Sequence, residues 1–147
     1  TYKWCKGSYD TQTKYCRSSG YGTVDNKKTL ELSDDAARAN WGGNWRMPTT
    51  AEQDELRKQC TWTWTIKNGV NGYKVTSNSN GKSIFLPAAG YCRGRSIGYA
   101  GSNGYYWSSS LYTGGPSGAY YLYFDSSGVD WRKCNRYYGL SVRPVCP

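Results

Sequence analysis

Two periods of apolar residues divide the middle of the chain into a helix and a strand. Thr49 and Glu52 form the Thr-x-x-Glu capping box that begins a helix, and Leu56 and Cys60 then share one helical face. From residue 61 the period changes to two, with Trp62, Trp64 and Ile66 on one side and threonines on the other. We therefore predict a helix over Ala51–Cys60 and a strand directly after it.

A shorter helix is predicted before this one, over Ser33–Asn40. Ser33 is a suitable N-cap, and Asp34 and Asp35 lie in the first turn, where the helix dipole favours negative charge. Two glycines at 42 and 43 end the element.

Short strands separated by turn residues make up the rest of the chain. Asn-Gly pairs at 68–69, 71–72 and 80–81 separate the first strand from runs at 73–76 and 83–86, which predicts a small antiparallel meander. Further strands are expected at 105–111, 119–124, 129–131 and 140–146, whereas residues 1–30 show no period and are expected to be irregular. Helices first and strands last indicate an α+β domain.

The strand at 119–124 bears directly on a possible binding surface. Leu122 and Phe124 occupy one parity of this strand, so Tyr121 and Tyr123 take the other and are expected to face solvent. Tyrosines beside basic and amide side chains are typical of protein recognition surfaces, because each ring offers apolar area and a polar tip.

Composition limits the function more than any single motif does. The 147 residues suit one domain spanning 1–147, and they include 7 Trp and 15 Tyr. Four tryptophans beside the helix and strand signals are expected in the core: Trp41, Trp45, Trp62 and Trp64. The absence of histidine excludes a Ser/His/Asp triad and every His-containing metal site. After Leu86 the only acids are Asp125 and Asp130, so we expect no enzymatic activity, no cofactor and no metal.

Charge and hydropathy argue against specific nucleic-acid binding and against a membrane-spanning segment. The net charge is +9, but the bases are diffuse, and the densest group is Arg132, Lys133 and Arg136. Specific nucleic-acid binding is therefore not expected, although anionic ligands are favoured. No apolar run approaches the roughly 18 residues of a membrane span, and the start at Thr1 fits a mature or trimmed chain.

Six cysteines without a Cys-x-x-Cys spacing favour disulfides over a zinc ribbon or a redox pair. Disulfides in turn indicate an extracytoplasmic protein, either secreted or on the cell surface. From the residues alone, about 15 pairings of six cysteines remain open.

Four phrases resemble a known family when they are taken together. The chain is similar, from about Asp34 to its end, to the Fibrobacter succinogenes major paralogous domain, a bacterial C-type-lectin-like module of surface proteins. The resemblance rests on Asn-Trp-Arg-Met-Pro-Thr at 44–49, Phe-Leu-Pro-Ala-Ala-Gly at 85–90, Tyr-Trp-Ser-Ser-Ser at 106–110 and Gly-Leu-Ser-Val-Arg-Pro-Val at 139–145. It implies a C-type-lectin-like fold, with two short helices on small antiparallel sheets and a loop-rich C-terminal half.

The resemblance also bears on Trp107 and on the cysteines. It implies that Trp107 is buried and that Ser108 to Ser110 bond to the backbone, and it implies a disulfide between the helix end and the chain end, Cys60 with Cys146. Cys5 with Cys16 is expected to close a short N-terminal loop, which leaves Cys92 with Cys134. Alternatively, Cys134 is a free thiol on the ligand face.

The C-terminal half is also similar to the variable proteins of diversity-generating retroelements, whose exposed residues change on a C-type-lectin scaffold. This similarity implies variable positions at Tyr112, Thr113, Ser117, Gly118, Tyr123, Asp125, Gly128, Asp130, Arg132, Lys133, Cys134, Asn135, Tyr138 and Leu140. Trp107 and Trp131 would be constant. The calcium-binding phrases of sugar-binding lectins are absent, so no calcium site is expected.

These observations lead to one functional hypothesis with two alternatives. We expect a monomeric, non-enzymatic recognition domain for a protein or glycan ligand on a cell or phage surface. The expected ligand residues converge on one exposed face, bordered by Arg93 and Arg95: Tyr112, Tyr123, Asp125, Asp130, Trp131, Arg132, Lys133, Asn135 and Tyr138. The alternatives are a carbohydrate-binding module and a structural adhesin domain without a ligand of its own.

Overall fold

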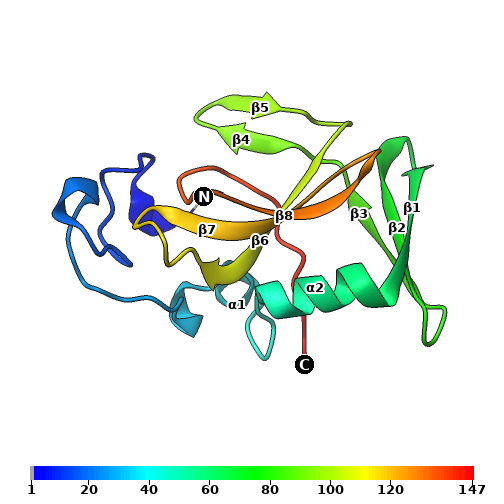
Figure 1. Ribbon diagram of the computed structural model, residues 1–147, viewed down its shortest axis with the longest axis horizontal. Coiled ribbons are helices and arrows are strands. Elements are labelled where there is room, and N and C mark those ends of the chain that lie inside the picture. The colour runs from blue at the N-terminus through cyan, green and yellow to red at the C-terminus, as the bar shows by residue number, and fades with distance from the viewer. Residues whose placement is uncertain (1) are drawn as a thin grey trace.

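The structure, a computed structural model, describes residues 2–147 and contains two α-helices and three small antiparallel sheets (Figure 1). This arrangement confirms the predicted α+β class. In Figure 1 the N-terminal segment lies at the left of the view and the first sheet at the right. No helix within residues 2–147 has the length and apolar character needed to cross a membrane.

The helical elements are the 3-10 turns η1 (Lys3–Cys5), η2 (Ser19–Tyr21) and η3 (Leu32–Asp34) and the helices α1 (Ala36–Trp41) and α2 (Thr50–Gln59). Helix α2 matches its prediction closely, and both halves of the capping box between Thr49 and Glu52 are present. Helix α1 begins later than predicted, because Ser33 lies in η3 and Asp35 is the N-cap.

The first sheet is the predicted meander of β1 (Cys60–Lys67), β2 (Val70–Ser77) and β3 (Ser83–Pro87), in the order β1-β2-β3. Trp62 and Trp64 pack against the core, as their spacing predicts. Ile66 shares their parity but is 67% exposed. The reason is that the end of the β1–β2 hairpin extends beyond the side chains that cover Trp62 and Trp64.

The other two sheets come from the second half of the chain. Strands β4 (Tyr91–Arg93) and β5 (Ser96–Gly98) form a hairpin that the sequence pattern did not reveal, and β6 (Gly104–Leu111), β7 (Gly118–Asp125) and β8 (Gly128–Asn135) form a sheet in that order. The predicted strand at 140–146 is absent. That segment makes only single bridges, Ser141 to Tyr106 and Val145 to Arg46, and Pro144 cannot donate a ladder hydrogen bond.

Both faces of the β6-β7-β8 sheet are covered by a hydrophobic core. On one face Tyr121 and Tyr123 pack with buried residues of the N-terminal segment, and on the other Leu122 and Phe124 pack with the first sheet. The expected exposure of Tyr121 and Tyr123 is therefore wrong, because a strand between two cores buries both parities. Trp107 is buried, as the family resemblance implied.

Two of the four tryptophans expected in the core lie on the surface instead. Trp41 is 59% exposed and Trp45 is also exposed, and their rings pack edge to face with centroids 5.0 Å apart. Helix α1 ends at Trp41, and the turn at Gly42 and Gly43 holds both rings outside the core.

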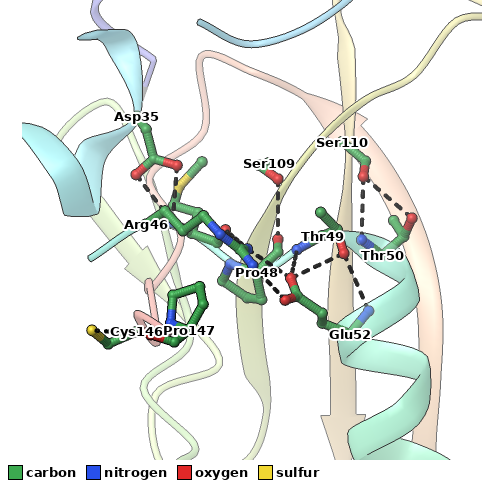
Figure 2. A network of polar contacts seen from close by, with 11 residues as sticks. Asp35, Arg46, Pro48, Thr49, Thr50, Glu52, Ser109, Ser110, Cys146 and Pro147 are labelled. Carbon is green, nitrogen blue, oxygen red and sulfur yellow. Dashed lines mark hydrogen bonds and ion pairs between the residues drawn. The ribbon is translucent and has the colours of Figure 1, made fainter. Parts of the chain in front are cut away.

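All six cysteines are free thiols in residues 2–147. Val145 pairs with Arg46, ahead of α2, whereas Cys60 follows the last residue of that ten-residue helix. Figure 2 shows Cys146 beside Arg46. The Cys60–Cys146 pairing remains a prediction, as do the Cys5–Cys16 and Cys92–Cys134 pairings.

Candidate recognition surface

The register of β7 and β8 decides on which side each expected ligand residue lies. Tyr123 pairs with Asp130 and Tyr121 with Arg132, while Leu122 pairs with Trp131 and Tyr120 with Lys133. Directly opposed residues of an antiparallel pair share a face of the sheet, and neighbours along a strand alternate. Arg132 and Lys133 therefore point to opposite sides.

The expected ligand residues consequently form two groups. Tyr123, Asp125, Asp130 and Arg132 lie on the face that also carries Tyr105, and Tyr138 joins them through Tyr91. The second group, on the other face, consists of Tyr112, Trp131, Lys133 and Asn135. The prediction that all of these residues converge on one face is wrong, because it did not account for the alternation along β8.

Tyr123 anchors the first group. Its hydroxyl donates a hydrogen bond to Asp125 Oδ2 and accepts one from Asn103 Nδ2, both over 2.7 Å. Burial raises the pKa of Tyr123, and the hydrogen bond to Asp125 raises it further. Hydrogen bonds from Ser127 and Tyr123 lower the pKa of Asp125 to about 2. Tyr123 is thus a fixed, neutral ring whose face is available to a cation.

That cation is Arg132, whose guanidinium carbon lies 3.6 Å from the centre of the Tyr123 ring. Stacking on an aromatic ring holds the planar guanidinium in one orientation and leaves its N–H groups free to bind other molecules. Arg132 itself is exposed.

A row of tyrosines continues from Tyr123 across the sheet to the β4–β5 hairpin. Tyr105 lies 5.3 Å from Tyr123 and 5.2 Å from Tyr91 between ring centroids, and Tyr91 stacks on Tyr138 at 5.7 Å. The guanidinium of Arg93 lies 5.6 Å from the Tyr138 ring. The row thus has an exposed arginine at each end. We call this set the tyrosine surface: Tyr91, Arg93, Tyr99, Tyr105, Tyr123, Arg132, Tyr137 and Tyr138.

An open groove of about 620 Å³ adjoins the tyrosine surface. Its walls are the β4–β5 hairpin, Tyr137 and the N-terminal residues 7–9. The groove mixes aromatic rings with the guanidinium of Arg93 and with backbone groups of several glycines. Such a lining suits a ligand with both apolar and polar parts.

The second group forms a smaller site on the opposite face. Lys133 Nζ lies 3.8 Å from the centre of the Tyr112 ring, and Tyr112 packs edge to face on Tyr120. Trp131 packs against the core that contains Leu122 and Phe124, and Asn135 accepts a hydrogen bond from Ser117. Trp131 also lines an open pocket of about 460 Å³ with Tyr112, Lys133 and Arg132, so the two groups meet at the edge of β8.

Four residues of the tyrosine surface were missed at the sequence level: Tyr91, Tyr99, Tyr105 and Tyr137. Tyr91 lies in the β4–β5 hairpin and Tyr99 directly follows it, and the three-residue strands of this hairpin are too short to show a period. Backbone hydrogen bonds between Cys92 and Gly139 hold this hairpin beside Tyr138. The contact joins positions 47 residues apart along the chain, so no local pattern reports it.

Within residues 2–147, no group of three His, Cys, Asp or Glu side chains lies close enough together to hold a metal ion.

The fold defines a small mixed α+β domain, and comparison with known proteins gives its family. Residues 65–145, more than half of the chain, match the family described as Domain of unknown function (DUF8237), so the chain belongs to that family. No curated protein and no solved structure matches it.

Proposed function

We propose that this domain binds a ligand through the tyrosine surface and catalyses no reaction on it. The observation that carries the proposal is the row of tyrosines with an exposed arginine stacked at each end. Tyrosine supplies contact area at a low cost in rotamer entropy, and arginine supplies charge-assisted hydrogen bonds to carboxylate, phosphate or sulfate groups. Affinity should fall with salt but persist, because the rings contribute independently of charge.

The proposal extends to the fold and location inferred from the family resemblance. We infer a C-type-lectin-like domain of a bacterial surface or secreted protein. Support comes from the four phrases at 44–49, 85–90, 106–110 and 139–145, which contact one another through hydrogen bonds. If retroelement-type diversification acts on this domain, its ligand-facing positions narrow to Asp125, Asp130, Arg132 and Tyr138, since the second group points away and Tyr123 is buried.

Carbohydrate binding is the second candidate. The rings of Tyr91 and Tyr138 are inclined by only 19°, and Tyr91 lines the open groove together with Arg93. A sugar could place its C–H face on such a ring while its hydroxyls reach Arg93. Screens against glycans and against proteins distinguish the two kinds of ligand.

A glycan array and a display library of bacterial and phage surface proteins, both screened with the full chain, test the proposal. Arg132→Ala and Arg93→Ala should each weaken binding about tenfold, equivalent to about 1.4 kcal/mol. The matched control is Lys133→Ala, since Lys133 is adjacent on β8, exposed and stacked on a tyrosine but points to the opposite face. Binding that is lost only in Lys133→Ala would contradict the proposal, and no binding in either screen would favour a structural domain.

A further inference from the structure

A second candidate site lies on the opposite face of the β6-β7-β8 sheet, where α2 covers the core that contains Leu122 and Phe124. A cavity of about 240 Å³ opens there between α2, β3, β6, β7 and the C-terminal segment. Three of its lining residues are polar, Glu52, Gln53 and Arg143, and the others are apolar or aromatic: Pro48, Leu56, Ile84, Leu86, Tyr106, Leu122, Pro144 and Val145. For comparison, an apolar cavity of about 150 Å³ can hold benzene, so this one has room for a longer apolar group.

Two hydrogen bonds make the wall of the cavity rigid on the side of α2. The amide nitrogen of the buried Gln53 donates to the carbonyl oxygens of Tyr106 and Trp107, at 3.2 and 3.3 Å. On the side of β6, the Tyr106 hydroxyl donates to the Pro87 carbonyl over 2.8 Å. The cavity is therefore bounded by side chains whose positions are fixed.

Arg143 lies at the mouth of the cavity and also lines a neighbouring groove on the outer face of the first sheet. Ile84 also lines both, so the cavity and the groove are adjacent at β3. The groove carries Lys67 and Lys74, and Lys67 Nζ lies 5.9 Å from the Phe85 ring.

The charges at this opening are unbalanced. In the part of the chain that the structure describes, none of Arg143, Lys67 and Lys74 forms an ion pair. The one acid in the cavity wall is Glu52, and its carboxylate already accepts both terminal N–H groups of Arg46, at 2.7 and 2.5 Å. An anion at Arg143 would therefore meet cations and a neutralised acid.

We propose that the cavity and its mouth bind an amphiphilic anion, a medium-chain fatty acid. The acyl chain would occupy the apolar cavity, and the carboxylate would accept two parallel hydrogen bonds from the Arg143 guanidinium, with Lys67 and Lys74 adding long-range attraction. This site shares no residue with the tyrosine surface, so an experiment can contradict one proposal without affecting the other.

Octanoate titrated into the full chain with methyl-labelled leucines tests the proposal by NMR. Octanoate should shift the methyl resonances of Leu56, Leu86 and Leu122. Butyrate, which has too little chain to fill the cavity, and 1-octanol, which lacks the charge, should each bind at least about tenfold more weakly.

Two variants and a control separate the parts of the site. Arg143→Gln should weaken octanoate about tenfold and leave 1-octanol unchanged, whereas Leu56→Phe should fill the cavity and abolish the binding of both. Lys28→Gln, an exposed lysine of the N-terminal segment, should change neither. Thermal unfolding of each variant establishes that it is folded.

Three results would overturn the proposal. The first is octanoate that leaves the three leucines unshifted, and the second is equal affinity for octanoate and 1-octanol. The third is an Arg143→Gln variant, folded by its thermal transition, that binds octanoate as tightly as the native chain.

Discussion

Asp35 is the side chain that ties α1 to the segment ahead of α2. It is 2% exposed, and its carboxylate accepts hydrogen bonds from the backbone N–H groups of Ala37, Arg38 and Met47 over 2.9 to 3.1 Å. Figure 2 shows the carboxylate pointing to this segment beside Arg46. Removal of the carboxylate would leave several buried donors without an acceptor, and each such donor is costly.

We expect Asp35→Ala to lower the free energy of unfolding by about 3 kcal/mol. Asp54→Ala is the control, because Asp54 pairs only with Arg57 and Lys58 on the surface of α2, and its loss should be barely measurable. Urea denaturation of both variants gives the comparison. Equal losses of stability in the two variants would show that Asp35 does not hold α1 to the segment ahead of α2.

The thiols should differ strongly in reactivity in the fully reduced protein. Cys146 is exposed, whereas Cys5 and Cys16 are buried. Burial raises the pKa of Cys5 to about 11 and that of Cys134 to about 12, so few of these thiols are ionised at neutral pH.

A thiol reagent at pH 8 should therefore label Cys146 first, and Cys5, Cys16 and Cys134 only after denaturant is added. Mass spectrometry of timed samples measures the order. The same mapping on unreduced protein tests the three disulfide predictions, and a Cys60 peptide linked to any partner but Cys146 would contradict the Cys60–Cys146 prediction.

At the scale of elements, sequence signals that span only a few residues predicted helix α2 and the first sheet well. The capping box located α2 to within one residue at each end, because Thr49 and Glu52 satisfy backbone groups only three residues apart. The β1-β2-β3 meander followed from the Asn-Gly turns at 68–69 and 80–81 and from the alternation of Trp62 and Trp64. The turn expected at 71–72 is wrong, because Asn71 and Gly72 lie within β2 and pair with β1.

The predictions for β7 and β8 failed because alternation does not reveal how many faces are covered. Tyr121 and Tyr123 alternate with Leu122 and Phe124, which reads as one face inward and one outward. Both faces are in fact buried, since the irregular N-terminal segment covers the face that was expected to be open. Most of the tyrosine surface could not be predicted for the same reason: long-range contacts, not local pattern, assemble it.

Close packing between β6 and β7 gives a prediction about one glycine. A Cβ atom at Gly104 would overlap the ring of Phe124, which is fully buried. Gly104→Ala should therefore lower the free energy of unfolding by about 3 kcal/mol through overpacking. Gly128→Ala is the matched control, because a Cβ there meets nothing and Gly128 does not have a positive φ. Similar stability of the two variants would refute the packing argument.

The free energy of unfolding should also depend on pH, because of Glu52 in helix α2. Hydrogen bonds from Arg46 lower the pKa of Glu52 from an ordinary value of 4.5 to about 2. A lowered carboxyl pKa contributes stability that is complete above the unfolded value and is lost as pH falls through the folded value. That loss should fall between about pH 4.5 and pH 2.

Glu52→Gln should therefore lower stability at pH 7 by about 1 kcal/mol, a figure reduced for the partial exposure of the pair. The difference from the native chain should shrink below pH 4.5 and vanish near pH 2, and unfolding at a series of pH values measures it. A difference that is independent of pH would show that the Arg46 pair is not its source.

At the scale of the whole molecule, the four family-like phrases form the frame of the fold. The Pro48 carbonyl accepts a hydrogen bond from Ser109 N–H, the Ser110 hydroxyl accepts one from Thr50 N–H, and Arg46 pairs with Val145 (Figure 2). These phrases hold the helices, β6 and the C-terminus together. The four phrases therefore determine the architecture, whereas most of the tyrosine surface lies in the segments between them.

The N-terminal segment is attached to this frame through Arg136. The Arg136 side chain is 2% exposed, and it donates hydrogen bonds to the carbonyl oxygens of Tyr15, Pro116 and Gly118. Its own carbonyl accepts a hydrogen bond from Tyr2 N–H at 3.0 Å. Burial lowers the pKa of Arg136, and in residues 2–147 the side chain has no carboxylate partner, so the three carbonyls carry its stabilisation.

Arg136→Met should consequently release the N-terminal segment and lower the free energy of unfolding by about 3 kcal/mol, because three buried carbonyls lose their donor while the methionine still fills space. Limited proteolysis should cut the variant within residues 2–31 under conditions in which the native chain is intact, and Cys5 and Cys16 should become reactive without denaturant. Arg132→Met, an exposed arginine on β8, is the control and should change neither. If Arg136→Met were destabilised but its N-terminal segment stayed protected, the side chain would stabilise the sheet alone, and the attachment of residues 2–31 would rest on the burial of Tyr2, Cys5 and Tyr15 instead.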